Sequence, residues 1–120
     1  MTSTIEQITG DEYTVVYNAD THTVGLSGTI RLQTSDDYAP LMALLQRAHD
    51  AAHGNKLKLD LRQLQFLNSS GISMISKFVI GARKQDQIIL VVQGNQAIYW
   101  QQKSLGNLQK LWPKVVIDIS

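Results

Sequence analysis

The chain has 120 residues, of which 43% are hydrophobic and 18% are charged, and its net charge is +1. This length and composition predict one globular domain with one core and exclude long disordered regions. Acidic and basic residues are interspersed, so the sequence has no run of basic residues that would indicate nucleic-acid binding. The absence of cysteine excludes disulfides and thiolate sites. Since no apolar run is long enough for membrane insertion and the first residues lack a signal-peptide pattern, we expect a cytoplasmic protein.

The first half of the chain predicts a β-hairpin followed by a helix. Residues 13–18 and 22–27 are rich in β-branched and aromatic types, and a short polar turn separates them. Residues 28–33 lead away as an extended connection. A helix then begins at the capping and acidic residues 34–37, and Gly54 ends it. Its apolar positions recur at helical spacing: Leu41, Leu44, Leu45, Ala48 and Ala52.

The second half of the chain predicts alternating strands and helices. Residues 56–61 and 64–67 are predicted strand segments, and residues 70–83 form an amphipathic helix. The apolar face of that helix carries Ile72, Ile75, Phe78, Val79 and Ala82. A continuous apolar run at 88–92 is typical of a strand buried on both faces. The remaining residues predict two short helices and a last strand, at 95–103, 104–112 and 115–119.

A hairpin followed by alternating helices and strands is the pattern of an α/β domain. We expect a mixed β-sheet of about five strands with about four helices packed on it. We expect this fold to be a single domain over residues 1–120.

The most informative segment joins a predicted strand to the amphipathic helix. It reads Asp-Leu-Arg-Gln-Leu-Gln-Phe-Leu-Asn-Ser-Ser-Gly-Ile, from Asp60 to Ile72. Asn68 is placed to cap the helix, and Ser69 and Ser70 follow it where backbone N–H groups are unpaired and carry partial positive charge. A phosphate added to a hydroxyl at this place would be stabilised. The segment therefore indicates a switch more than a catalyst, with an ordinary helix cap as the alternative interpretation.

The chain resembles the single-domain STAS proteins of the bacterial anti-sigma factor antagonist family. The resemblance rests on the Asp-Leu strand, the Ser-Ser-Gly helix start and, more weakly, the Leu-Gly-containing segment from Ser104 to Leu108. It implies a non-enzymatic STAS domain without a cofactor, which binds a serine/threonine protein kinase or anti-sigma factor. It also implies that the kinase phosphorylates Ser69, that a PP2C-type phosphatase removes the phosphate, and that the partner is sequestered when Ser69 is unphosphorylated.

One position of the motif departs from the family pattern, because Asn68 stands where the family usually has Asp. Asparagine still caps a helix but carries no charge, and this favours the alternative of a constitutive STAS-like scaffold or an accessory subunit for ligand or lipid transport. We expect the Ser70 hydroxyl to bond backbone near the helix start and Gly71 to allow close packing of helix on strand. The exposed helix face supplies the candidate partner-binding residues, which are Ser73, Lys77, Ile80 and Lys84.

Two histidines, His49 and His53, are four residues apart on a predicted helix, which is a spacing found in metal sites. No carboxylate motif or cysteine accompanies them, so the preferred interpretation is a solvated helix face. No phosphate-binding loop pattern occurs in the sequence. We therefore expect neither a metal site nor catalytic residues.

Overall fold

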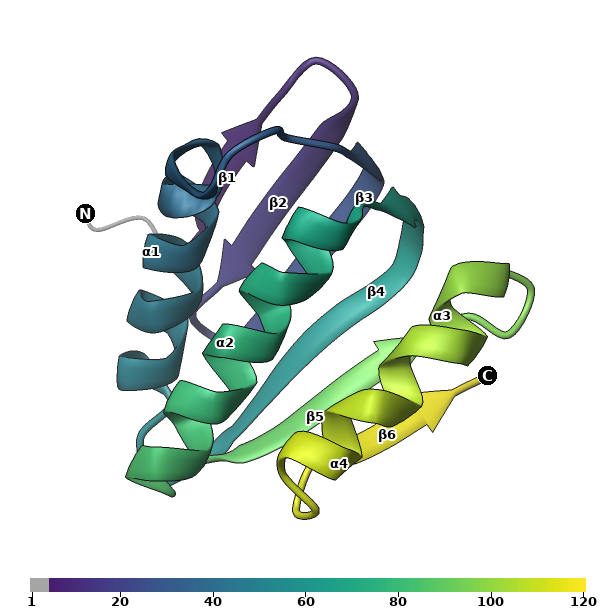
Figure 1. The fold of residues 1–120 in the computed structure, drawn as a ribbon. Coiled ribbons are helices and arrows are strands. Elements are labelled where there is room, and N and C mark those ends of the chain that lie inside the picture. The colour runs from purple at the N-terminus through teal and green to yellow at the C-terminus, as the bar shows by residue number, and fades with distance from the viewer. Residues whose placement is uncertain (1–4) are drawn as a thin grey trace.

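A six-stranded sheet, covered on one face by helices, forms the fold (Figure 1), and the computed structural model describes residues 5–120. The strands follow one another in space as in sequence, and they are β1 (Ile5–Thr9), β2 (Tyr13–Asn18), β3 (Thr23–Ile30), β4 (Lys56–Leu67), β5 (Ile89–Gly94) and β6 (Val116–Ile119). The helices are α1 (Ser35–Ala51), α2 (Ser69–Gln85), α3 (Tyr99–Ser104) and α4 (Leu108–Leu111), with the 3-10 turn η1 (Leu105–Asn107) between the last two. The predicted α/β class is confirmed.

The sheet is mixed, as the sequence predicts. Strands β1, β2 and β3 pair antiparallel, whereas β3, β4, β5 and β6 pair parallel. Parallel neighbours need a crossover connection, and α1 and α2 supply the first two of these. Both helices therefore begin at the edge of the sheet where β3 and β4 end, and they lie side by side along its face (Figure 1). This arrangement brings two helix N-termini together.

The core lies between the sheet and the helices. Alternate residues of β4 point toward the helices, and Leu57, Leu59 and Leu61 are completely buried there. The apolar face predicted for the first helix is buried as expected. In α2 the buried side chains include Ile75, Phe78, Val79 and Ala82, while Ile72 is half-buried. Helical spacing of apolar residues was therefore a correct guide to which face packs on the sheet.

The strand prediction was incomplete in two places. Strand β1 was not predicted, because it is an edge strand whose side chains are mostly exposed and show no apolar alternation. The segments predicted at 56–61 and 64–67 are one strand, β4. Its last residues pair with β3 after the pairing with β5 has ended at Asp60, and the register with β3 shifts on the way. The polar Arg62 and Gln63 interrupt the apolar pattern at this point, which explains the error.

The helices near the C-terminus also differ from the prediction. Helix α3 begins at Tyr99 rather than at residue 95, and it continues through η1 into α4 without a separate start. The three pieces together are called the α3 arm. Helix α1 ends at Ala51, three residues before Gly54, which has a positive φ of 80° in the turn that follows.

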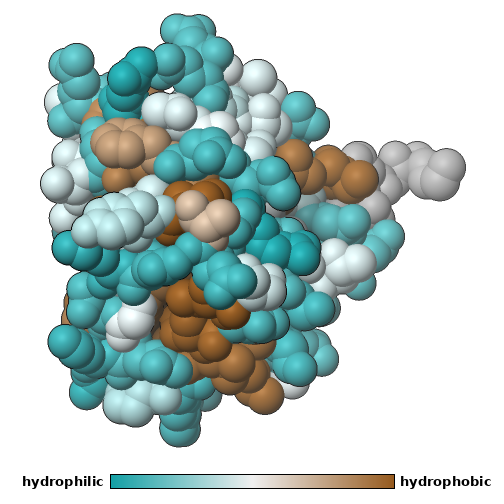
Figure 2. Space-filling view, turned by 90° about the vertical axis from the view of Figure 1, so that its right-hand side faces the viewer, coloured by the Kyte–Doolittle hydropathy of each residue, from teal (hydrophilic) through white to brown (hydrophobic). Residues whose placement is uncertain are grey.

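Figure 2 shows the side of the molecule formed by the α3 arm and β6. Brown hydrophobic areas and teal hydrophilic areas alternate on it. Ile89 on β5 and Val116 on the edge strand β6 are 54% and 46% exposed.

Among the helices of residues 5–120, none combines the length and the apolar character needed to cross a membrane. The predicted lack of a signal peptide concerns a stretch whose residues 1–4 lie outside the described part of the chain.

Candidate functional site

The start of α2 is fixed by the side chain of Asn68. Asn68 occupies the N-cap position that the sequence predicts, and its Oδ1 accepts a hydrogen bond from the Gly71 N–H at 3.0 Å. The same oxygen accepts a second bond from the Tyr38 hydroxyl at 2.5 Å. Its Nδ2 donates to the Leu32 carbonyl at 2.8 Å. An aspartate could serve the first two donors, but it would present an oxygen to the Leu32 carbonyl, so this network requires asparagine.

Tyr38 connects α1 to this cap. Its side chain is buried, and burial is the main cause that raises the pKa of its hydroxyl above the ordinary value. Gly71 lies against the same hydroxyl, because a Cβ at this position would be 2.8 Å from the Tyr38 oxygen and 2.2 Å from a Leu67 methyl carbon. The close packing predicted for Gly71 is therefore present, and it fixes the first turn of α2 against both β4 and α1.

The two serines of the motif are both exposed. The hydroxyl of Ser70 has no hydrogen-bond partner among residues 5–120, so the expectation that it bonds the backbone was wrong. Asn68 already serves the Gly71 N–H, and this leaves no capping role for the serine. Both hydroxyls are therefore accessible to another protein.

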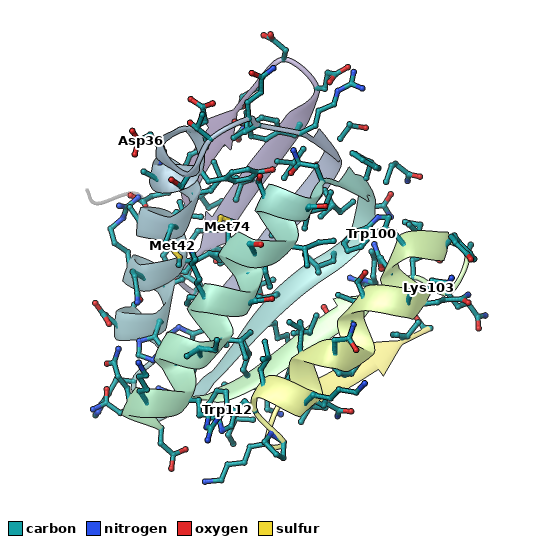
Figure 3. All side chains as sticks on the ribbon, viewed as in Figure 1. Asp36, Met42, Met74, Trp100, Lys103 and Trp112 are labelled. Carbon is teal, nitrogen blue, oxygen red and sulfur yellow. The ribbon has the colours of Figure 1, made fainter. Side chains whose placement is uncertain are left out.

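A groove of about 360 Å³ opens beside the motif, between α1 and α2. Each helix contributes residues at positions i, i+3, i+4 and i+7, and the lining consists of Ser35, Tyr38, Ala39 and Met42 from α1 and Ser70, Ser73, Met74 and Lys77 from α2. Figure 3 shows Met42 and Met74 in the space between the two helices, while Asp36 points away from it. Lys77 is the only charged residue among the described ones that line this groove.

The predicted partner-binding face is exposed along its whole length, at Ser73, Lys77, Ile80 and Lys84. The groove takes in Ser73 and Lys77, whereas Ile80 and Lys84 lie outside it. The α1 wall of the groove was not among the predicted site residues. The helical spacing of Ser35, Ala39 and Met42 was visible in the sequence, but their position opposite α2 depends on how the two helices pack.

The interpretation of the histidine pair as a solvated helix face was wrong for His49. Its side chain is 1% exposed, whereas His53 is exposed. The His49 Nδ1 lies 3.1 Å from the Asp50 carboxylate, and its ring stands edge-on to Phe78 at 6.3 Å between centroids. His49 is therefore a packing residue between α1 and α2. Among the described residues no cluster of metal-ligating side chains occurs.

The other side of α2 faces the α3 arm, which holds the end of β4. Gln101 is completely buried, and its Nε2 donates to the carbonyls of Leu61 at 2.6 Å and Leu64 at 3.0 Å. Its Oε1 accepts from the Asn95 N–H at 2.7 Å, and the Trp100 indole N–H also donates to Leu64 at 3.2 Å. These side chains replace the β5 partners that β4 has lost. No sequence pattern marked Gln101.

An ion pair lies where β4 leaves β5. Arg62 donates to both carboxylate oxygens of Asp60 at 2.9 Å, from Nε and one Nη. These hydrogen bonds are the main cause that lowers the pKa of Asp60 below its ordinary value. Asp60 points to the face of the sheet opposite the helices, because its neighbours Leu59 and Leu61 face the core. The pair is thus separate from the motif.

Comparisons with known proteins identify the fold. No family model matches the chain, and no curated protein matches it in sequence. A chain of the crystal structure of the diguanylate cyclase SiaD with its activator SiaC, from Pseudomonas aeruginosa, aligns with a TM-score of 0.72 and 13% identity, over 96% of this chain and 99% of that one. SiaC of the same organism aligns with a TM-score of 0.65 and 12% identity, over 98% and 97% of the two chains. Apo-SiaC aligns with a TM-score of 0.66 and 14% identity, over 98% and 99%. At these identities the likeness establishes a shared STAS-like fold.

Proposed function

We propose that this protein is a non-enzymatic regulator that acts by binding a partner protein on α2 and in the groove between α1 and α2. The observation that carries the proposal is the groove itself. It opens at the first turn of α2, where Ser70 forms part of its wall and the unpaired N–H groups of a helix start are close by. One residue of the motif, Ser70, therefore belongs to the proposed binding surface.

The lining of the groove suits a helical segment of the partner. Met42 and Met74 are unbranched and adaptable, and methionine-lined surfaces accept varied apolar side chains. Matched positions one and two turns apart on α1 and α2 make two walls along which a third helix can lie. Lys77, the charged residue of the lining, favours a partner with an acidic residue next to its apolar row.

The first candidate for the partner is a diguanylate cyclase. The support is the likeness to SiaC, which covers nearly the whole of both chains and which activates such an enzyme in Pseudomonas aeruginosa. The second candidate is a serine/threonine kinase of the anti-sigma type, which the Asp-Leu strand and Ser-Ser-Gly motif favour. Both candidates use the protein as a binding component and require no catalytic residue from it.

We infer that phosphorylation of Ser69 would regulate the contacts that the partner makes on the outer face of α2, beside the groove. A kinase would phosphorylate the exposed Ser69 hydroxyl and a PP2C-type phosphatase would remove the phosphate. The phosphate adds about −1.5 to −2 charge at pH 7. The partial positive charge of the helix start stabilises it, so the fold survives. In an apolar interface the same charge must lose its water, which can cost several kcal/mol.

The alternative of a constitutive scaffold is favoured by Asn68. Its side-chain groups are committed to Gly71, Tyr38 and Leu32, so this residue has a complete structural role without any kinase. In that case the groove would be occupied whatever the state of Ser69.

Binding measurements with purified proteins test the proposal. The protein should be titrated calorimetrically into each diguanylate cyclase and each anti-sigma-type kinase of its native cell. Lys77→Glu should weaken the complex at least tenfold, which corresponds to about 1.4 kcal/mol. The matched control is Lys110→Glu, the same charge reversal at an exposed position on α4. Equal effects of the two variants, or no complex with any candidate, would contradict the proposal.

A further inference from the structure

Ser69 and Ser70 are neighbours in sequence but belong to different surfaces. Successive residues of an α-helix are about 100° apart around its axis. Ser70 lies on the side of α2 that faces α1 and lines the groove, together with Ser73 and Lys77. Ser69 does not line it. A group added to Ser70 would therefore enter the groove, whereas a group added to Ser69 would extend from the outer face of α2.

The groove offers hydroxyl hydrogen-bond donors near Ser70 and one positive charge, Lys77, at its other end. Ser73 is three residues away on the same helix, so its Cβ is about 5–6 Å from that of Ser70. Lys77 is two turns away, about 10.5 Å along the axis, a distance that a phosphoserine and a lysine side chain can span together. Ser35 contributes a hydroxyl from the facing wall. Among the described residues that line the groove there is no carboxylate to repel an anion.

The acidic residues at the start of α1 do not oppose this. Asp37 is turned toward its own helix start, where its carboxylate accepts a hydrogen bond from the Thr34 N–H. Asp36 points away from the groove (Figure 3). The positive charge of Lys77 is therefore not neutralised within the groove, and an anion on Ser70 would meet a favourable potential.

We propose that Ser70 is a second phosphate acceptor, and that its phosphate occupies the groove and pairs with Lys77. In the modification, the Ser70 Oγ attacks the γ-phosphorus of a nucleoside triphosphate held by a protein kinase. An O–P bond forms, the bond to the β-phosphate oxygen breaks, the nucleoside diphosphate leaves and the hydroxyl proton passes to a base of the kinase. The inference deepens the proposed function and rests on it, because it assumes that the groove is the docking site and that a kinase acts on this helix start.

The two phosphates then have different effects. Phosphoserine at position 70 fills the space that the partner's side chains would take and uses the charge of Lys77 that would attract the partner's acid. Phosphoserine at position 69 leaves the groove open and affects only contacts on the outer face of α2. A partner that docks mainly in the groove is released by the first modification more than by the second.

Protein with phosphoserine installed genetically at position 69 or at position 70 tests the placement without a kinase. The probe is the phosphate itself, whose 31P NMR signal is monitored as the pH is varied. The 13C methyl resonances of Met42 and Met74 are recorded on the same samples. The phosphate at position 70 should titrate at lower pH than that at position 69, and only it should shift both methyl resonances. Lys77→Gln should remove the titration difference. Equal titration in the two proteins, with unmoved methionine signals, would overturn the placement.

Peptide mapping of the protein from its native cell tests whether the modification occurs, with Ser69→Ala and Ser70→Ala as controls for neighbouring positions. Phosphate on Ser70 that persists in Ser69→Ala supports the inference. Phosphate on Ser69 alone overturns the inference and leaves the proposed switch intact. Absence of phosphate at both positions overturns the inference and the phosphorylation switch together, while binding in the groove is then judged by the calorimetry alone.

Discussion

The two flanks of α2 are built differently. Toward α1 the helix borders an open groove of about 360 Å³. Toward the α3 arm the corresponding space is about 10 Å³, and it is lined by mostly apolar side chains, which are Leu67, Ile72, Ile75, Trp100, Ser104, Leu105 and Leu108. A close-packed flank contributes stability, whereas an unfilled one with a few polar groups is the usual form of a binding site. In the proposed function, this helix contributes to the core on one side and to partner binding on the other.

The size of the facing side chains explains the difference. The wall that α1 presents to α2 includes Ser35 and Ala39, which are too small to fill the space between the helices. The α3 arm presents Trp100 and Leu105, and Gln101 anchors the arm to the end of β4 by buried hydrogen bonds. Buried bonds of this kind are costly to break, so the α3 flank resists opening. On the α1 flank the Tyr38 hydroxyl donates a hydrogen bond to Asn68 at the N-terminal end. Further along, the buried ring of His49 packs edge-on against Phe78, so the groove is confined to the first turns of the two helices.

Matched truncations on the two flanks should show the largest effect. Leu105 is buried on the α3 flank, so Leu105→Ala should lower the free energy of unfolding by about 2–5 kcal/mol. Met42 is half-buried at the groove, and Met42→Ala should cost less, about 1 kcal/mol, because its side chain is already partly in water. Denaturant unfolding of both variants measures the difference. Equal losses would mean that the groove is as well packed as the α3 flank.

The cap that joins α1 to α2 should show the next largest effect. Asn68→Asp removes the donor to the Leu32 carbonyl and sets two oxygens against each other, so it should cost about 1–3 kcal/mol at neutral pH. The ionised acid is the disfavoured form in the folded state, so its folded pKa is raised. The loss of unfolding free energy in this variant, relative to the wild type, should therefore be present at neutral pH. It should disappear as the pH falls below the ordinary range of a carboxyl pKa.

Asn95→Asp is the matched control for this substitution on the other flank. Asn95 Nδ2 also donates to a backbone carbonyl, that of Arg62, but at 3.3 Å and in an exposed setting. The same change of amide to acid should cost less there, because water can replace the lost partner. If thermal unfolding shows equal losses for the two variants, the buried network around Asn68 is not what fixes the cap.

Sequence patterning predicted what depends on local periodicity. The core faces of α1 and α2 and the cap at Asn68 follow from spacing and capping chemistry. The apolar run at 88–92 located β5, but the burial on both faces that it predicts fails at Ile89, which is 54% exposed. The groove could not be predicted, because it depends on which side chains of two helices meet. The same holds for the hydrogen bond between Tyr38 and Asn68, which are thirty residues apart, and for Gln101, whose partners lie on β4.

The ion pair of Asp60 and Arg62 should show a smaller, pH-dependent effect on the strand that both flanks share. The pKa of Asp60 is lowered in the folded state, so the pair stabilises the protein above the ordinary carboxyl range, near 3.9, and this contribution is lost as the pH falls through the lowered folded pKa. Because the pair is partly exposed, its contribution should be below about 1 kcal/mol. Arg62→Gln should remove this pH dependence.

A control for the ion pair is Lys114→Gln, which removes the exposed pair with Asp86. Unfolding curves at neutral and acidic pH should show a smaller change for this variant than for Arg62→Gln. A large loss of stability in Arg62→Gln at every pH, including pH values at which Asp60 is protonated, would mean that Arg62 stabilises the end of β4 by something other than its ion pair.

The exposed positions of α2 should show the smallest effect on stability and the clearest effect on binding. Ile80 is 36% exposed and Lys77 is exposed, so Ile80→Asp and Lys77→Glu should each change the free energy of unfolding by no more than about 0.5 kcal/mol. Lys77 lines the groove, whereas Ile80 lies on the outer face of the helix. A partner that uses the groove alone should bind Ile80→Asp normally and Lys77→Glu weakly in calorimetric titrations, while a partner that also covers the outer face should bind both weakly. Normal binding of both variants would place the interface elsewhere and would leave Ser69 as an ordinary residue of a helix start.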